Sequence, residues 1–178
     1  MKKNIVLIGL SGCGKTSIGK RLAHRLHMPL LDTDAMIVQK TGRSIPDIFA
    51  QDGEAFFRDL ESDCAREASA RCGIVISTGG GMVLRSRNME LLSENGLICF
   101  IDRHPSLILR STTLSDRPLV QSDKEKLFRL HAERIALYRR WADITLVNGK
   151  SMNGRIKRGV LRIIKHWKKR RSACQEAS

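Results

Sequence analysis

The stretch Gly9-Leu10-Ser11-Gly12-Cys13-Gly14-Lys15-Thr16 has the residue types and spacing of a phosphate-binding loop, G-x-x-x-x-G-K-[ST]. The β-branched run Ile5–Ile8 before it predicts a buried strand. After it, Ile18, Leu22 and Leu26 lie four residues apart, which predicts a helix over 17–26 with one apolar stripe. The motif therefore lies between a strand and a helix, the context in which it binds phosphate.

We expect the backbone N–H groups of this loop and of the following helix to hold the phosphates of ATP, because the helix dipole there favours negative charge. Lys15 is expected to bridge the β- and γ-phosphates, and Thr16 to offer its hydroxyl to Mg²⁺. The expected ATP-binding residues are Ser11, Gly12, Cys13, Gly14, Lys15, Thr16 and Ser17.

Two aspartates follow the second predicted strand, Met28–Leu31. Asp32 and Asp34 are two residues apart, so in an extended strand their side chains point to the same side. In open α/β sheets the carboxyl ends of the strands face the ligand crevice. We therefore expect these carboxylates to bind Mg²⁺ and the attacking hydroxyl, and not merely to lie in a solvated turn.

An arginine and a run of glycines indicate a site for a hydroxylated anion. A helix is predicted over 54–71, where Arg58 and Glu61 share one face, so that Glu61 can hold a guanidinium that binds a carboxylate. The third predicted strand, 74–78, runs into Gly79-Gly80-Gly81. Glycines there let a ligand approach the backbone and leave N–H groups for hydroxyls or phosphate.

A polar loop over 112–123 contains Arg117, which can swing over the phosphates as a lid cation. It separates a helix that begins at Pro105 from an amphipathic helix over 124–140. The buried side of the second helix is predicted to carry Leu127, Leu130, Ile135 and Tyr138.

Strands alternate with helices along the whole chain. Further helices are predicted over 35–40, 45–50 and 83–94, and further strands over 97–101 and 143–147. This order predicts an α/β fold, a three-layer α/β/α arrangement around a five-stranded parallel sheet, as in P-loop kinases. We expect one domain over 1–178, with a lid at about 112–123 and a basic helix and tail at about 153–178.

The composition is that of a globular protein. Of the 178 residues, 42% are hydrophobic and 28% charged, and no apolar run reaches the length of a membrane span. The first strand begins too early for a cleavable signal peptide, and the cysteines form no C-x-x-C pair. We expect a cytoplasmic protein with reduced thiols, no membrane partner and no zinc site. The cysteines are Cys13, Cys64, Cys72, Cys99 and Cys174.

The net charge of +14 is concentrated near the end of the chain. Between Arg155 and Arg171 there are nine lysines or arginines and no acid. The apolar residues among them predict a terminal helix with one docked face and one solvated basic face, followed by a frayed tail from Lys168. Because only 4% of the residues are aromatic, few stacking platforms exist, and we do not expect nucleic acid as a partner. The predicted docked residues are Ile156, Val160, Ile163, Ile164 and Trp167.

Over essentially its whole length the chain resembles the shikimate kinase family. The resemblance is carried by motifs that occur in the family's order and approximate spacing. They are the loop ending Gly14-Lys15-Thr16, Asp32-x-Asp34, Phe57-Arg58-x-x-Glu61, Gly79-Gly80-Gly81, Arg117-Pro118-Leu119 and Glu133-Arg134-x-x-x-Tyr138. The first motif marks only a nucleotide binder, whereas the other five together are specific.

The resemblance implies transfer of the ATP γ-phosphoryl group to the 3-hydroxyl of shikimate. It implies that Arg58 and Arg134 hold the substrate carboxylate, that Asp34 contacts the reacting hydroxyl, and that Lys15 and Arg117 steady the transferred charge. It also implies that the backbone of Gly79, Gly80 and Gly81 holds a ring hydroxyl. Thr16, and Asp32 through water, would bind Mg²⁺. The backbone of 148–151 would contact adenine. Separately, we expect the protein to be a monomer.

Other functions fit parts of the same pattern. A gluconate or nucleoside kinase shares the phosphate loop, and gluconate is also a hydroxylated carboxylate, so only the family resemblance separates it from shikimate. A nucleotide-dependent nucleic-acid-binding module using the basic tail predicts salt-sensitive binding that is lost when residues after Arg155 are removed. A non-catalytic switch fits poorly with the intact Lys15, Thr16, Asp32 and Asp34.

Overall fold

The computed structural model describes residues 3–110, 124–149 and 152–175. The predicted lid over 112–123, with Arg117, lies outside these residues. So do Lys150 and Ser151 of the segment expected to contact adenine.

Five parallel strands form one sheet in the order β2-β3-β1-β4-β5. The central strand β1 pairs with both β3 and β4, so that Leu7 lies opposite Ser77 on one side and Cys99 on the other. All strands point the same way, and their carboxyl ends therefore meet at one edge of the sheet. The strands are β1 Asn4–Ile8, β2 Leu30–Asp32, β3 Val75–Ser77, β4 Gly96–Asp102 and β5 Ile144–Val147.

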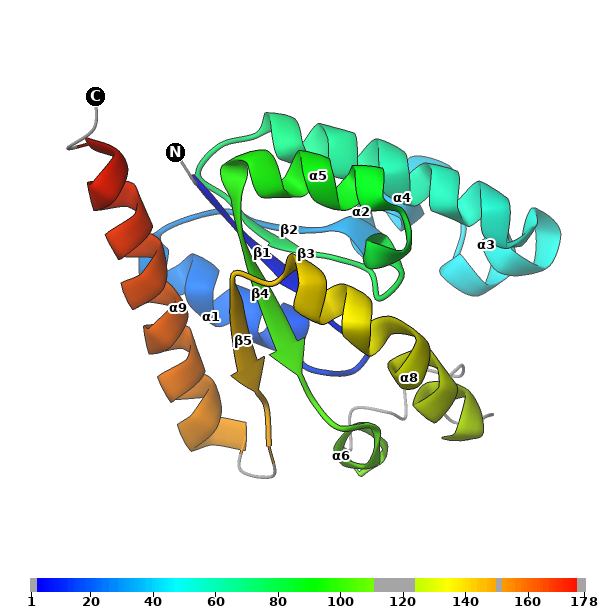
Figure 1. The fold of residues 1–178 in the computed structure, drawn as a ribbon. Coiled ribbons are helices and arrows are strands. Elements are labelled where there is room, and N and C mark those ends of the chain that lie inside the picture. Colours follow the sequence, from blue (N-terminus) through cyan, green and yellow to red (C-terminus); the bar gives the residue numbers. More distant parts are fainter. Residues whose placement is uncertain (1–2, 111–123, 150–151, 176–178) are drawn as a thin grey trace.

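Helices cover both faces of the sheet (Figure 1). Helices α1 and α9 pack together on one face, while α4, α5 and α8 lie on the other. The three-layer α/β/α arrangement is thus confirmed. The helices are α1 Lys15–Leu26, α2 Thr33–Thr41, α3 Ile45–Gln51, α4 Gly53–Ala70, η1 Met82–Leu84, α5 Ser86–Asn95, α6 Pro105–Leu109, α8 Lys124–Trp141 and α9 Met152–Gln175.

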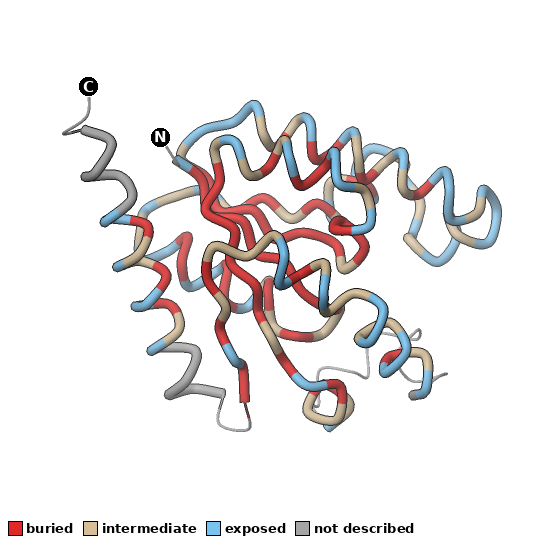
Figure 2. Tube along the Cα trace, in the orientation of Figure 1, coloured by how far each residue is buried: buried red, intermediate tan, exposed pale blue. Residues whose placement is uncertain are grey.

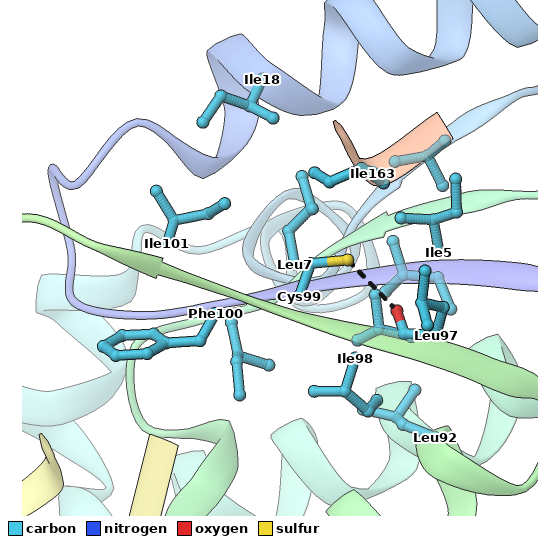
Figure 3. Close-up of a cluster of buried hydrophobic side chains, with 14 of the residues drawn as sticks. Ile5, Leu7, Ile18, Leu92, Leu97, Ile98, Cys99, Phe100, Ile101 and Ile163 are labelled. Atoms are coloured by element: carbon cyan, nitrogen blue, oxygen red, sulfur yellow. Dashed lines mark hydrogen bonds between the residues drawn. The ribbon is translucent and has the colours of Figure 1, made fainter. Parts of the chain in front are cut away.

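The core runs along the sheet, where buried residues concentrate (Figure 2). Figure 3 shows Ile18 of α1 and Ile163 of α9 on one side of the central strands, and Leu92 of α5 on the other. These side chains are at most 3% exposed. A fully buried aliphatic side chain stabilises the fold by about 1.5–3 kcal/mol, so the strands and the helix stripes hold the sheet edge rigidly. None of the helices in the described residues is both long and apolar enough to cross a membrane.

Strand β2 ends at Asp32, before Asp34, so the two aspartates do not share one extended strand. Asp32 is the last strand residue, whereas Asp34 lies in the first turn of α2. The Asp32 side chain caps that helix, because Oδ1 accepts from the N–H groups of Asp34 at 3.1 Å and Ala35 at 3.4 Å. The end of β2 therefore places the Asp32 carboxylate, and the first turn of α2 places that of Asp34. The prediction that both lie on one side of an extended strand was wrong.

Two helix predictions were also wrong in part. The predicted helix 83–94 is divided into η1 and α5 by the extended Arg85, whose guanidinium reaches across to Asp59 and Ser62 of α4. The predicted frayed tail instead continues α9 to Gln175. Lysine, arginine and alanine have high helix propensity, and neither glycine nor proline interrupts that segment.

Candidate active site

The phosphate loop joins β1 to α1 through glycines with a backbone that other residues rarely adopt. Gly9, Gly12 and Gly14 have φ angles of +141°, +78° and +103°. A Cβ on Gly9 would also lie 2.7 Å from the Ile101 carbonyl oxygen of β4. The motif's glycines are therefore required by the turn itself, in the predicted context of strand, turn and helix.

Lys15 lies inside this loop. Its ammonium group donates to the carbonyl oxygens of Gly9 and Leu10, both at 2.8 Å, and the residue is 7% exposed. The first helical hydrogen bond of α1 runs from the Ile18 N–H to the Gly14 carbonyl, at 3.0 Å. The N–H groups of 15–17 precede that bond, so a cation and a helix N-terminus converge on one small volume that suits a phosphate.

A side chain directly after β5 supports the phosphate loop. The Asn148 amide donates from Nδ2 to the Cys13 carbonyl at 2.8 Å, and the side chain is almost fully buried. A Cβ on Gly14 would lie 2.9 Å from the same nitrogen. From the sequence, only the backbone around this position was expected to contact adenine. The anchoring side chain was missed, since no local pattern marks a contact across 135 residues.

Oxygen ligands lie beside the loop at the ends of β2 and β3. The Thr16 hydroxyl donates to Asp32 Oδ2 at 3.0 Å and lies 3.4 Å from the Ser77 hydroxyl. Asp32 and Ser77 are paired in the sheet register, so the fold brings them together. Hard oxygen donors of this kind suit Mg²⁺, which is commonly held by one or two carboxylates together with phosphates and water. Ser77 was not singled out in the sequence.

The predicted pair of Arg58 and Glu61 on α4 is confirmed. Arg58 donates from Nη1 to Glu61 Oε2, and from Nε and Nη2 to Glu54 Oε1 at 3.1 and 2.7 Å. Glu61 is fully buried, and Glu54 is mostly exposed. Two carboxylates thus fix the guanidinium, while each Nη keeps a second N–H for another acceptor.

Electrostatics within this pair follow from burial. Burial raises the pKa of the Glu61 carboxyl above its usual range, although Arg58 acts in the opposite direction. Burial alone lowers the pKa of the Arg58 guanidinium, but Glu61 and Glu54 outweigh it and the net pKa is raised. Arg58 therefore remains a cation and supplies positive charge at the site.

The glycine run after β3 is packed directly against these charged groups. A Cβ on Gly79 would lie 2.5 Å from Asp34 Oδ1 and 2.7 Å from Glu61 Oε1. A Cβ on Gly81 would overlap the guanidinium of Arg58. At Gly79 and Gly81 it is the protein's own side chains that approach the backbone closely, and the approach of a ligand there stays a prediction.

Gly80 connects the two halves of the site. Its carbonyl accepts from Arg134 Nη1 at 3.2 Å and from the Tyr138 hydroxyl at 2.6 Å, both on α8. A Cβ on Gly80 would lie 3.2 Å from the Ser11 nitrogen of the phosphate loop. The fold therefore brings Arg134 and Gly80 beside that loop. The resulting arrangement can hold a phosphate chain next to a smaller anion bound by two guanidinium groups, with the Asp34 carboxylate close by.

Comparison with known proteins identifies relatives across almost the whole chain. A family model described as shikimate kinase matches residues 11–166. The shikimate kinase of Clostridium botulinum is 39% identical over 164 residues, covering 90% of this chain and 99% of the relative. That of Burkholderia pseudomallei is 43% identical over 155 residues, covering 85% and 84%.

Solved structures agree with these relatives. A shikimate kinase of Acinetobacter baumannii in complex with shikimate is 33% identical, with a TM-score of 0.83 and coverage of 94% of each chain. A shikimate kinase of Bacteroides thetaiotaomicron is 28% identical, with a TM-score of 0.84, covering 93% of this chain and 98% of the other. The predicted P-loop kinase fold is therefore confirmed.

Proposed function

The chain belongs to the shikimate kinase family, and we propose that it transfers the γ-phosphoryl group of ATP to the 3-hydroxyl of shikimate. The observation that carries the proposal is the position of Arg58 and Arg134 around the glycine run, next to the phosphate loop. Guanidinium groups bind a planar carboxylate through parallel hydrogen bonds. A phosphate site beside such a pair suits a kinase whose acceptor is a hydroxylated carboxylate.

On the phosphate side, the proposed ligands are the N–H groups of 11–17. Lys15 exchanges the carbonyl oxygens of Gly9 and Leu10 for phosphate oxygens, which are stronger acceptors because they are charged. Thr16 and, through water, Asp32 would hold Mg²⁺ with the phosphates. When bound, Mg²⁺ supplies positive charge that offsets the charge of the phosphate oxygens.

On the acceptor side, Arg58 and Arg134 bind the carboxylate of shikimate, and the backbone of 79–81 holds a ring hydroxyl. Asp34 accepts a hydrogen bond from the reacting hydroxyl and takes up its proton as the phosphoryl group is transferred. Arg117, which lies outside the described residues, is proposed to cover the phosphates as a lid cation. Most of the rate enhancement is then positioning and electrostatics.

We further propose that the chain is one domain, acts as a monomer in the cytoplasm and has small-molecule substrates rather than nucleic acid. The described cysteines carry free thiols, which suits a reducing compartment. Gel filtration with light scattering tests the monomer, and a salt titration of binding to duplex DNA tests the last point.

A coupled assay of ADP release tests the main proposal. Purified protein with Mg-ATP is given saturating shikimate, saturating gluconate or no acceptor. We expect turnover above background only with shikimate, and its loss on omission of Mg²⁺. Turnover with gluconate instead would assign the same site to another acceptor, and background rates with both would refute the proposal.

A further inference from the structure

One buried phenol shares its acceptor with a substrate-facing arginine. Tyr138 is 1% exposed, and its hydroxyl donates to the Gly80 carbonyl at 2.6 Å, while Arg134 donates to the same oxygen at 3.2 Å. The Tyr138 ring stacks on Phe100 of β4, with ring centroids 5.1 Å apart. This stacking fixes the hydroxyl. Burial also raises the pKa of Tyr138, so the group stays a hydrogen-bond donor over the ordinary pH range.

The peptide groups beside Gly80 are held as well. The Gly79 N–H donates to the Thr33 hydroxyl at 2.9 Å, and the Gly79 carbonyl accepts from the Met82 N–H at 3.3 Å. Among these peptide groups, as far as the structure describes the chain, the one between Gly80 and Gly81 is oriented by α8. The C=O and N–H of a trans peptide point in opposite directions, so the hold on the Gly80 carbonyl also orients the Gly81 N–H.

Arg134 is bound less firmly than Arg58. Arg58 is hydrogen-bonded to two carboxylates, whereas Arg134 donates to a neutral carbonyl and only its charge attracts Glu54 and Glu61. Within the described residues, Arg134 Nε is buried without a hydrogen-bond partner. A carboxylate is a stronger acceptor than a peptide carbonyl. A carboxylate that enters the site therefore competes with the Gly80 carbonyl for Arg134, and within the described residues the other donor to that carbonyl is Tyr138.

We propose that Tyr138 is a positioning residue that keeps the Gly80 carbonyl hydrogen-bonded and in place when Arg134 turns to the carboxylate of the acceptor. This inference rests on the proposed function for the identity of that acceptor. It predicts that loss of the Tyr138 hydroxyl weakens the binding of a ligand with a carboxylate and leaves the binding of its neutral analogue unchanged. If Tyr138 had a purely structural role, its loss would weaken the binding of both ligands equally.

Tyr138→Phe tests this, because it keeps the stacked ring and removes only the hydroxyl. Calorimetric titration gives the affinities for shikimate and for shikimate carboxamide, whose neutral carbonyl has no advantage over Gly80 as an acceptor for Arg134. We expect binding of shikimate to weaken by about ten-fold, because it now leaves the Gly80 carbonyl without a hydrogen-bond donor. Binding of the carboxamide should change by less than about two-fold. Phe100→Leu is the matched control: it should lower the thermal midpoint and leave the ratio of the two affinities unchanged.

Equal weakening for both ligands, or unchanged binding of shikimate, would overturn the proposal. Failure of the wild-type protein to bind shikimate would instead refute the proposed function. Since the chain contains one tyrosine, a ¹³Cζ label at Tyr138 gives a single NMR signal in the wild-type protein, even where the variant fails to fold. Shikimate is expected to shift this signal more than the carboxamide does, and equal shifts would contradict the exchange at Gly80.

Discussion

The two halves of the site are built in different ways. The phosphate side is one continuous loop, and the bonds that hold Lys15 run to Gly9 and Leu10 a few residues away. The acceptor side brings together α2, α4, α8 and the glycine run after β3. Its connecting bonds, such as Arg134 to Gly80 across 54 residues, exist only in the folded chain.

This difference separates ligand binding from fold stability. Removing the Lys15 side chain takes away a contact to nucleotide, and the bonds it makes in the fold all lie within its own loop. Removing one from the acceptor side leaves neighbouring buried groups without partners, which costs stability as well as affinity. Variants on each side should therefore differ in which substrate they affect and in how much the protein is destabilised.

The largest expected effect is on chemistry, where the two halves meet. We expect Asp34→Asn to lower kcat by about 10²–10⁴-fold, because the amide cannot accept the proton of the reacting hydroxyl. The affinity for ATP should stay nearly unchanged, since the phosphate loop does not contain this residue. Steady-state kinetics and calorimetric titration of ATP measure the two quantities. Turnover at the wild-type level would remove Asp34 from the mechanism.

Substitution of the two arginines should separate binding from stability within the acceptor side. Arg58→Ala and Arg134→Ala are each expected to weaken shikimate binding by about 2–5 kcal/mol, because each removes a partner of the carboxylate. Arg58→Ala should also lower the free energy of unfolding by about 3–5 kcal/mol, since it leaves Glu61 buried without its cation. Arg134→Ala removes one hydrogen bond to a carbonyl and should cost about 1 kcal/mol.

Urea denaturation and the KM for shikimate check this pair of variants. An unchanged KM in both would refute the assignment of the carboxylate. Equal loss of stability in both would contradict the greater dependence of the fold on Arg58.

Asn148→Ala tests whether the phosphate side also depends on a distant contact. Loss of the hydrogen bond to the Cys13 carbonyl should weaken ATP binding by about 1 kcal/mol, because the loop loses its contact to the segment after β5. Shikimate binding measured without nucleotide should not change. Thr145→Ala, on β5 just before Asn148, serves as a control that leaves this bond intact. A selective loss of shikimate affinity would show that the two halves are not independent.

The smallest expected effect is a pH dependence confined to the acceptor side. Burial raises the pKa of Glu61 above 4.5, so on acidification this carboxyl takes up its proton while ordinary carboxyls are still ionised. Arg58 then loses its charged partner, and the KM for shikimate should rise as pH falls through that pKa. Glu61→Gln should flatten this limb of the KM profile. An identical profile in the variant would assign the limb to another group.

The same pKa shift affects stability in the opposite direction: protonation of Glu61 at low pH weakens shikimate binding but favours folding. A carboxyl whose pKa is higher in the folded than in the unfolded state favours folding when protonated. The contribution of Glu61 is therefore present below pH 4.5 and is lost as pH rises through the raised pKa. As pH rises through that pKa, the free energy of unfolding of the wild type should fall relative to that of Glu61→Gln, which lacks this carboxyl.

Local patterns in the sequence determined the phosphate side and the layers of the fold. The glycines with positive φ, the apolar run of β1 and the stripe of α1 each act within a few residues, so their meaning can be deduced from spacing. The face shared by Arg58 and Glu61 could be predicted for the same reason, because both lie on one helix.

Only the tertiary structure decided how the acceptor side is assembled and which distant side chains support the phosphate loop. Ser77 beside Thr16, Asn148 under the loop and Tyr138 on Gly80 are contacts between distant segments, and sheet register and helix packing choose them. Asp34 makes the same point, because the capping of α2 by Asp32 and not the period of a strand placed it against Gly79. Residue types and spacing thus determined which groups this protein carries for its chemistry, while burial and packing decided which of them share a partner.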